Sequence, residues 1–185
     1  NAAYLHYTTN NTIFGTQFAY TPDAGNTPLV ADMSSDICSR PVDVSKHAVI
    51  YAGAQKNLGP SGVTVVILSP WAVERSRTVG QSRPGGLPAM LDYGLMVDKE
   101  SLFNTPNTFG IFALERVLAW IQDNGGVTEM AARNDEKAAH LYGALDGTDF
   151  WTPYAVDGSR SLMNVTWRGP NEELEKMFIA QADAA

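Results

Sequence analysis

The chain has 185 residues, of which 44% are hydrophobic and 18% charged, a composition that is typical of a globular protein and excludes an intrinsically disordered one. Its 13 Lys and Arg against 20 Asp and Glu give a formal charge of -7, which repels a phosphate backbone, so we expect no nucleic-acid binding. The longest apolar runs, such as residues 63–68, are far shorter than the ~20 residues that span a bilayer, so we expect no membrane segment.

Four short apolar runs predict β-strands, at residues 4–8, 29–31, 49–52 and 63–68. Their near-continuous hydrophobicity is typical of strands that are buried on both faces of a sheet. We therefore predict an α/β fold with a mainly parallel sheet. Gly53, Gly59, Pro60 and Gly62 follow the third run and predict a tight turn in which the backbone approaches a neighbour closely.

Lys56 lies in this turn, and Asp32 stands at the end of an earlier predicted strand. The stretch between them can hold one connecting segment and a returning strand, so both residues can lie at the sheet edge where open α/β sheets bind ligands. A pyridoxal phosphate enzyme needs this arrangement, because the lysine supplies the imine nitrogen and the aspartate pairs with the pyridinium nitrogen. Burial of Lys56 would favour its neutral, reactive form.

Other interpretations of these two residues stay open at this point. A lysine is most often a solvated surface residue, and Asp32, next to Ser34 and Ser35, could be a turn aspartate. A nucleotide-binding phosphate loop is excluded, because its lysine follows the glycines and precedes Ser or Thr, whereas Lys56 comes before Gly59.

Cys38 is the single cysteine, so no internal disulfide can form, and we expect a reducing cytoplasm as the compartment. Because no histidine partner is recognisable, we expect Cys38 to be a small core residue rather than a nucleophile. His6, His47 and His140 are not spaced as metal ligands, so we predict no metal site.

Residues 77–103 are rich in Gly, Pro and Ser and show no sustained period, which predicts a long loop. Long loops in compact domains are usually functional, but a flexible surface excursion fits the same composition.

The following segment, residues 108–124, carries apolar side chains at the spacing of one helical face and ends at two glycines. We predict a buried helix here, with an aromatic stripe that belongs to the core rather than to a cofactor site. The stripe consists of Phe109, Phe112, Ala113, Val117, Trp120 and Ile121.

A further helix is predicted over residues 127–145. Alternation over residues 161–167 then predicts a strand, and Asn171, followed by Glu172 and Glu173, predicts the start of a last helix. A strand and a helix after two long helices indicate a second, smaller domain. We therefore predict a large-domain segment over residues 1–126 and the start of a small domain over residues 127–185.

Residues 30–37 (VADMSSDI), 39–46 (SRPVDVSK) and 50–60 (IYAGAQKNLGP) together resemble the central motif of the phosphoserine aminotransferases. The resemblance implies a class-V pyridoxal phosphate enzyme of fold type I. It also implies that residues 1–126 are the C-terminal part of the cofactor-binding large domain and that both ends of the family protein are missing. The start, Asn1-Ala2-Ala3-Tyr4, has no initiator methionine and reads as a cut through a longer chain.

The resemblance also implies roles for individual residues. Lys56 matches the Schiff-base lysine, and Asp32 matches the partner of the pyridinium nitrogen. Further matches to cofactor contacts are Thr12, Gln55 as a phosphate ligand, and Asn104 with Thr105 in the sequence FNTP. The FNTP loop of the family reaches across a dimer interface to the neighbour's cofactor phosphate, which implies a homodimer with shared sites. The family's residues for substrate carboxylate and phosphate lie in the missing ends.

The implied reaction is reversible amino transfer between glutamate and 3-phosphohydroxypyruvate, giving phosphoserine and 2-oxoglutarate, in serine synthesis. Some members of the family also act on a related phosphorylated hydroxythreonine in vitamin B6 synthesis. Two alternatives stay open: another pyridoxal phosphate enzyme, such as a lyase or a desulfurase, and a non-catalytic module that keeps the fold for binding or assembly. The 185 residues alone are expected to form an incomplete site and to bind the cofactor poorly.

Overall fold

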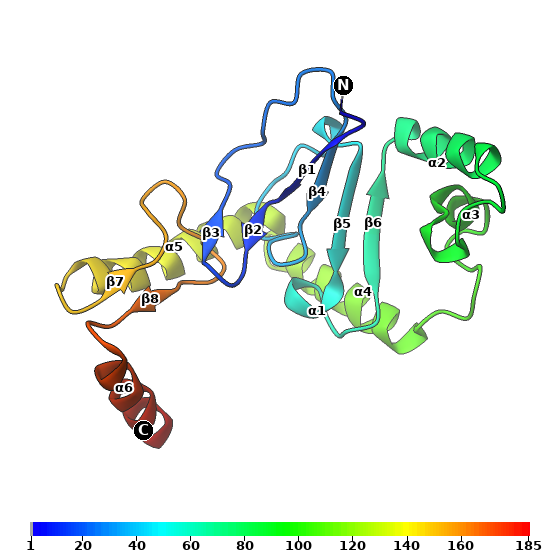
Figure 1. The fold of residues 1–185 in the computed structure, drawn as a ribbon. Helices are drawn as coiled ribbons and strands as arrows, with labels where there is room; N and C mark the ends of the chain where they lie inside the picture. Colours follow the sequence, from blue (N-terminus) through cyan, green and yellow to red (C-terminus); the bar gives the residue numbers. More distant parts are fainter. Residues whose placement is uncertain (1) are drawn as a thin grey trace.

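The computed structural model describes residues 2–185 and is built around a four-stranded sheet (Figure 1). Its strands lie in the order β1 (Leu5–Thr8), β4 (Leu29–Asp32), β5 (Val49–Gly53) and β6 (Thr64–Leu68). β4 is parallel to both β1 and β5, whereas β6 is antiparallel to β5. The predicted α/β fold with a mainly parallel sheet is confirmed. Residue 1, where the predicted large-domain segment begins, lies outside the described residues.

Burial alternates along β4 and β5, and no residue of β6 is fully buried, so the prediction of strands buried on both faces is wrong for this chain. Ala31, Ile50 and Ala52 are buried on one face, where they pack against Met33 and Leu58. On the opposite face the side chains are half-buried or exposed. Successive strand residues point to opposite faces, and within residues 2–185 a packed core covers one of them.

Two short antiparallel pairs lie beside this sheet: β2 (Asn10–Asn11) with β3 (Thr16–Gln17), and β7 (Thr152–Pro153) with β8 (Trp167–Arg168). The predicted strand over residues 161–167 is therefore wrong for all but its last residue. Ser161 N–H donates to the Gly15 carbonyl, but the next N–H, of Leu162, donates to the side chain of Gln17. Because a side chain replaces a backbone acceptor, no regular ladder forms.

The predicted loop over residues 77–103 is also wrong for much of its length. Helix α2 (Pro70–Ser82) runs into it, and a 3-10 turn, η2 (Ala89–Leu91), and helix α3 (Tyr93–Asp98) follow. Both α-helices have N-caps, since Ser69 accepts a hydrogen bond from Ala72 N–H and Asp92 accepts one from Leu95 N–H. In Figure 1 these helices lie beyond β6 at one side of the molecule.

Helix α4 (Thr108–Asp123) forms where it is predicted, but its aromatic stripe does not belong to the core. Phe109 is 74% exposed and Trp120 is 53% exposed. The helix packs instead through Gly110, where a Cβ would lie 2.8 Å from Cγ2 of Val63, and through Ile121, the one member of the predicted stripe that is buried. Leu114 packs against the sheet core on the same side. The spacing of the apolar residues identified the apolar face correctly, but few side chains of residues 2–185 pack against the aromatic residues of that face.

Helix α5 (Gly126–Asp146) follows α4 after a break at Gly125 and Gly126, which have φ angles of 94° and 70°, a conformation that favours glycine. Its far half contributes Ala138, Tyr142 and Leu145 to a second core cluster, distinct from the one under the sheet. The division of the chain near residue 127 stays a prediction.

The last helix, α6 (Glu172–Ala184), begins after Asn171, which accepts a hydrogen bond from Leu174 N–H, so the predicted N-cap is confirmed. Two short elements complete the chain: helix α1 (Ala54–Asn57) and the 3-10 turn η1 (Val44–Lys46). Within residues 2–185, no helix has the length and apolar character needed to cross a bilayer. Nor do any three His, Cys, Asp or Glu side chains of that range gather where a metal ion could be held.

Candidate active site

The candidate site lies where the parallel strands end. β1 ends at Thr8, β4 at Asp32 and β5 at Gly53, and because these strands are parallel their carboxyl ends share one edge of the sheet. Thr12 and Lys56 follow the ends of β1 and β5 within a few residues. The structure therefore brings Thr12, Asp32 and Lys56 to the edge where open α/β sheets bind ligands.

Lys56 is held from across this edge by Thr12. Its Nζ donates a hydrogen bond of 2.8 Å to Thr12 Oγ1, a contact between residues 44 positions apart. Helix α1 sets the direction of the side chain, because Ala54 and Leu58 are buried in the core and Asn57 donates to the Ile37 carbonyl. Lys56 then points outward and is exposed. Its predicted burial is wrong, since none of the described residues covers this side of α1.

Asp32 is half-buried at the end of β4, between Thr8 of β1 and Tyr51 of β5. One carboxylate oxygen, Oδ1, accepts a 2.9 Å hydrogen bond from Ser34 N–H, so this residue is also the turn aspartate of the alternative interpretation. Burial, and after it the charge of Asp32, raises the pKa of Tyr51, whose hydroxyl hydrogen-bonds to His6 Nε2 at 3.0 Å.

Neither charge of this pair is neutralised by a neighbour. Within residues 2–185, Lys56 and Asp32 take part in no ion pair. A half-buried carboxylate without a cation and an amine without a carboxylate favour a ligand that carries the complementary groups.

Gln55 is exposed and folds back over the end of β5. A Cβ on Gly53 would lie 2.8 Å from Gln55 Oε1, so the absence of a side chain at position 53 makes room for the amide. The N–H of Gly53 donates to Ser34 Oγ at 3.1 Å, which ties the start of α1 to the turn after Asp32. The amide of Gln55 therefore lies beside the residues that position Lys56 and Asp32.

Asn104 and Thr105 are not brought to the other predicted residues. Both are exposed, and Asn104 Nδ2 donates to the Thr105 carbonyl. Among the hydrogen bonds of the described residues, none joins this pair to Lys56, Asp32, Thr12 or Gln55. Nearby Asn107 caps α4 and donates to the Ser61 carbonyl, so the loop is held beside the turn that precedes β6.

The remaining candidates of the sequence analysis have structural contacts. Cys38 packs partly buried against the core, and burial raises the pKa of its thiol. His47 is buried and its Nε2 hydrogen-bonds to the Tyr7 hydroxyl at 2.8 Å, while burial lowers the pKa of the imidazole.

Sequence reasoning missed a buried carboxylate and a buried polar cluster next to the site. Asp36 is buried and accepts hydrogen bonds from Thr9 and Gln17, and burial raises its pKa. Ser161 and Asn164 come from the far end of the chain to Asn10. The distance along the sequence hides these contacts, because no local pattern marks a polar residue as the partner of one some 150 positions away.

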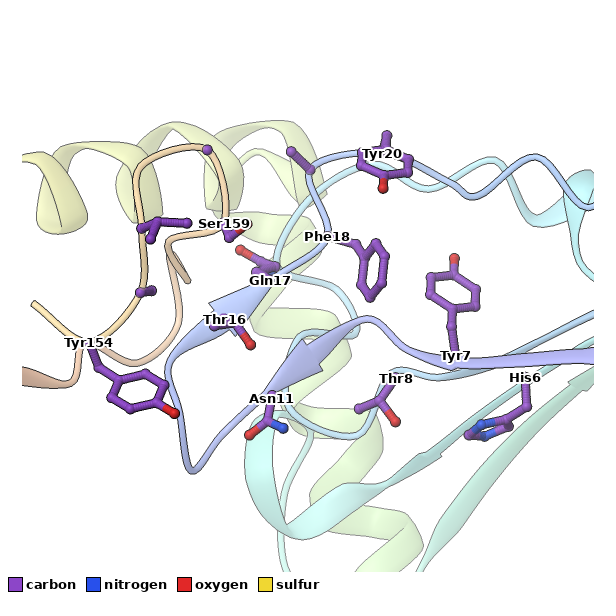
Figure 2. A pocket seen from close by; sticks show the side chains of 14 residues that line it. His6, Tyr7, Thr8, Asn11, Thr16, Gln17, Phe18, Tyr20, Tyr154 and Ser159 are labelled. Carbon is purple, nitrogen blue, oxygen red and sulfur yellow. The ribbon is translucent and has the colours of Figure 1, made fainter.

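A cavity of about 680 Å³ lies next to this cluster and is lined by β1, by the β2–β3 pair with the segment that follows it, and by the loop after β7 (Figure 2). Figure 2 shows Asn11 and Thr16 on one side of it and Tyr154 and Ser159 on the other. No residue of the predicted site lines it.

Comparisons with known proteins identify the family of the chain. The family model described as "Aminotransferase class-V" matches residues 1–185. The chain is 59% identical over 185 residues to the phosphoserine aminotransferase of Geobacillus kaustophilus (strain HTA426), covering 98% of this chain and 49% of that protein. The chain thus spans about half the length of the curated relatives it matches.

Solved structures of phosphoserine aminotransferases also have a fold similar to that of this chain. The phosphoserine aminotransferase from Bacillus circulans subsp. alkalophilus superimposes with a TM-score of 0.90 at 48% identity, covering 100% of this chain and 49% of that one. A phosphoserine aminotransferase from Trichomonas vaginalis, described as bound to PLP, gives 0.82 at 36% identity, over 93% of this chain and 48% of that one.

Proposed function

The chain belongs to the class-V aminotransferases, and from this premise we propose that it is the central part of a phosphoserine aminotransferase. The proposed reaction transfers an amino group reversibly between L-glutamate and 3-phosphohydroxypyruvate, giving 2-oxoglutarate and O-phospho-L-serine. The observation that carries the proposal is the 59% identity, over 98% of the chain, to a relative of that name. The same match disfavours a lyase, a desulfurase and a non-catalytic module.

We propose pyridoxal phosphate as the cofactor, and the donor set at the sheet edge fits it. The cofactor has an aldehyde, which reacts with an amine, and a pyridine nitrogen, which a carboxylate keeps protonated. Lys56 is an accessible amine held by a hydrogen bond, and Asp32 is a carboxylate without a cation at the same edge. Thr12 and Gln55 add a hydroxyl and an amide for the remaining polar groups.

When bound, pyridoxal phosphate supplies a sink for the electron pair of the substrate Cα–H bond. The residues of this chain then have separate tasks. Lys56 Nζ would hold the cofactor, and as a free amine it would accept the substrate Cα proton as a general base and return it as a general acid. Thr12 Oγ1 orients that amine, and Asp32 keeps the ring nitrogen protonated.

We also propose a homodimer in which Asn104 and Thr105 serve the partner's site. The exposed apolar side chains of α4, Phe109 and Trp120 among them, support an interface next to this loop, because contiguous exposed apolar surface marks interaction sites. The single cysteine supports a reducing cytoplasm as the compartment. The similarity to phosphoserine aminotransferases supports a role in serine synthesis, and we extend the proposal to vitamin B6 synthesis.

The decisive test is an assay of the full-length protein with glutamate and 3-phosphohydroxypyruvate, with phosphoserine detected by mass spectrometry. Formation of phosphoserine only in the presence of pyridoxal phosphate supports the proposal. Phosphohydroxythreonine as amino donor tests the second pathway, and cysteine with sulfide detection tests a desulfurase. Sulfide production without phosphoserine would replace the proposed activity with the alternative.

A further inference from the structure

We infer that Asn164, in the C-terminal part of the chain, is a positioning residue for Lys56, acting through the turn that carries Thr12. The inference rests on the proposed function, because it assigns a task to Lys56. It adds a residue from the segment 159–166, which the resemblance does not connect with the site.

The turn over residues 11–15 has a few hydrogen bonds of its own. Asn11 Oδ1 accepts from the N–H groups of Ile13 and Phe14, and the Asn11 carbonyl accepts from Gly15 N–H at 2.9 Å. These bonds shape the turn, but they do not attach it to the rest of the molecule. The β2–β3 pairing anchors the two ends of the turn, and contacts outside residues 11–15 determine the position of its middle.

The segment 159–166 provides those contacts. Asn164 Nδ2 donates to the Thr12 carbonyl at 2.6 Å, and Thr166 Oγ1 donates to the Phe14 carbonyl at 2.8 Å. The N–H of Ser161 donates to the Gly15 carbonyl at 2.9 Å. The fit leaves no room at Gly15, where a Cβ would lie 2.7 Å from Thr166 Oγ1.

A buried network fixes the orientation of the Asn164 amide. Ser161 is 0% exposed and its hydroxyl donates to Asn10 Oδ1. Asn10 Nδ2 donates to Asn164 Oδ1 at 2.9 Å, so the other end of the Asn164 amide, Nδ2, is turned toward Thr12. Asn10 Nδ2 also donates to Ser35 Oγ at 2.9 Å, which joins the network to the turn after Asp32.

The consequence is a continuous path from Asn164 to Lys56. Asn164 holds the main chain of Thr12, and the hydroxyl of Thr12 accepts the hydrogen bond from Lys56 Nζ. Loss of the Asn164 donor frees the Thr12 carbonyl and lets its hydroxyl move away from the amine. A reacting group that is held in the right geometry reacts faster. A break in the path from Asn164 to Lys56 should therefore slow the reaction of the lysine amine.

The experiment measures how fast pyridoxal phosphate attaches to Lys56 in the full-length apo-protein. Attachment is trapped with borohydride at successive times and located by peptide mass spectrometry. This readout needs no amino acid substrate and no turnover. The variants are Asn164→Asp, Thr12→Val and the double variant.

Asn164→Asp keeps the acceptor for Asn10 and replaces the donor to the Thr12 carbonyl with a carboxylate oxygen, which that carbonyl repels. We expect each single variant to slow attachment about five-fold, as for the loss of one hydrogen bond. The double variant should be no slower than either single one, because both changes break the same path. The matched control is Asn171→Asp, which makes the same change of side chain at the N-cap of α6, outside the network. This variant should attach the cofactor at the unchanged rate.

Two results overturn the inference while leaving the proposed function intact. One is normal attachment in Asn164→Asp, whatever the change in thermal stability, which reduces the network to a structural role. The other is a double variant in which the two effects multiply. Failure of the unsubstituted protein to attach the cofactor at Lys56 overturns the proposed function itself, and the inference with it.

Discussion

Two regions of the molecule differ in how many contacts within the chain hold their polar side chains. At the carboxyl edge of the sheet, Thr12, Asp32 and Lys56 come from three separate segments, and the chain itself supplies the contacts that hold them. Around the start of α4, Asn104 and Thr105 are exposed beside an apolar helix face that little covers. In the first region, contacts within the chain hold polar side chains in place, whereas the second region presents exposed polar and apolar side chains.

Replacing Lys56 tests the first region most directly. Lys56→Ala in the full-length protein should abolish covalent attachment of pyridoxal phosphate, because no other lysine stands at the sheet edge within residues 2–185. Borohydride reduction followed by mass spectrometry measures this. Lys46→Ala, which removes another exposed lysine, is the control and should attach normally. An undiminished visible band in Lys56→Ala would remove the residue from the mechanism.

Asp32→Asn should have the next largest effect. The amide keeps an oxygen for the Ser34 N–H, so the turn is preserved, while the negative charge is lost. We expect cofactor attachment to persist and turnover to fall roughly 100- to 1,000-fold, the scale on which a preorganised electrostatic group contributes. Steady-state rates and cofactor titration separate the two effects. Near-normal turnover would refute the role of the charge.

Mixed dimers can test whether the second region, with Asn104 and Thr105, contributes to the site of the partner subunit. If Asn104 and Thr105 serve the partner's site, a dimer of one Lys56→Ala subunit and one subunit with Asn104→Ala and Thr105→Ala contains one intact site. We expect about half of the wild-type activity per dimer when two poorly active variants are combined, since each dimer has two sites. Differently tagged subunits allow the mixed species to be purified.

The same experiment has a clear opposing outcome. If Asn104 and Thr105 act within their own subunit, the mixed dimer contains one site without the lysine and one without the loop residues. Its activity should then be no higher than the mean of the two parent variants. That result would mean that Asn104 and Thr105 do not contribute to the partner's site across an interface.

The difference between the regions also explains what sequence reasoning could reach. Apolar runs predicted the four sheet strands, and the ends of those runs led to Asp32 and Lys56, because the carboxyl ends of parallel strands share one edge of the sheet. Residues 77–103 were misread because Gly and Pro outweighed the capping signals of Ser69 and Asp92. The face of α4 was identified correctly, but periodicity cannot tell what covers a face. The contact of Asn164 with Thr12 joins residues 152 positions apart, and no local pattern encodes it.

Two substitutions in α4, one on each face of the helix, are expected to have the smallest effects. Gly110→Ala places a methyl group 2.8 Å from Val63 Cγ2 on the packed face, and overpacking of this kind costs about 1–3 kcal/mol, partly offset by the better helix propensity of alanine. Phe109→Ala removes a ring that is 74% exposed, so it should cost little stability within one subunit. Urea unfolding measures the first effect, which should not depend on protein concentration.

Phe109→Ala should instead act on association. If a partner covers this face, the variant dissociates at a higher concentration than the wild type in sedimentation experiments, because the apolar area buried between subunits is smaller. Equal dissociation of Phe109→Ala and wild type, together with equal unfolding midpoints, would mean that this part of α4 faces solvent in the assembled protein. The exposed aromatic face would then no longer support an interface, and the placement of Asn104 and Thr105 at a partner's site would depend on the mixed dimers alone.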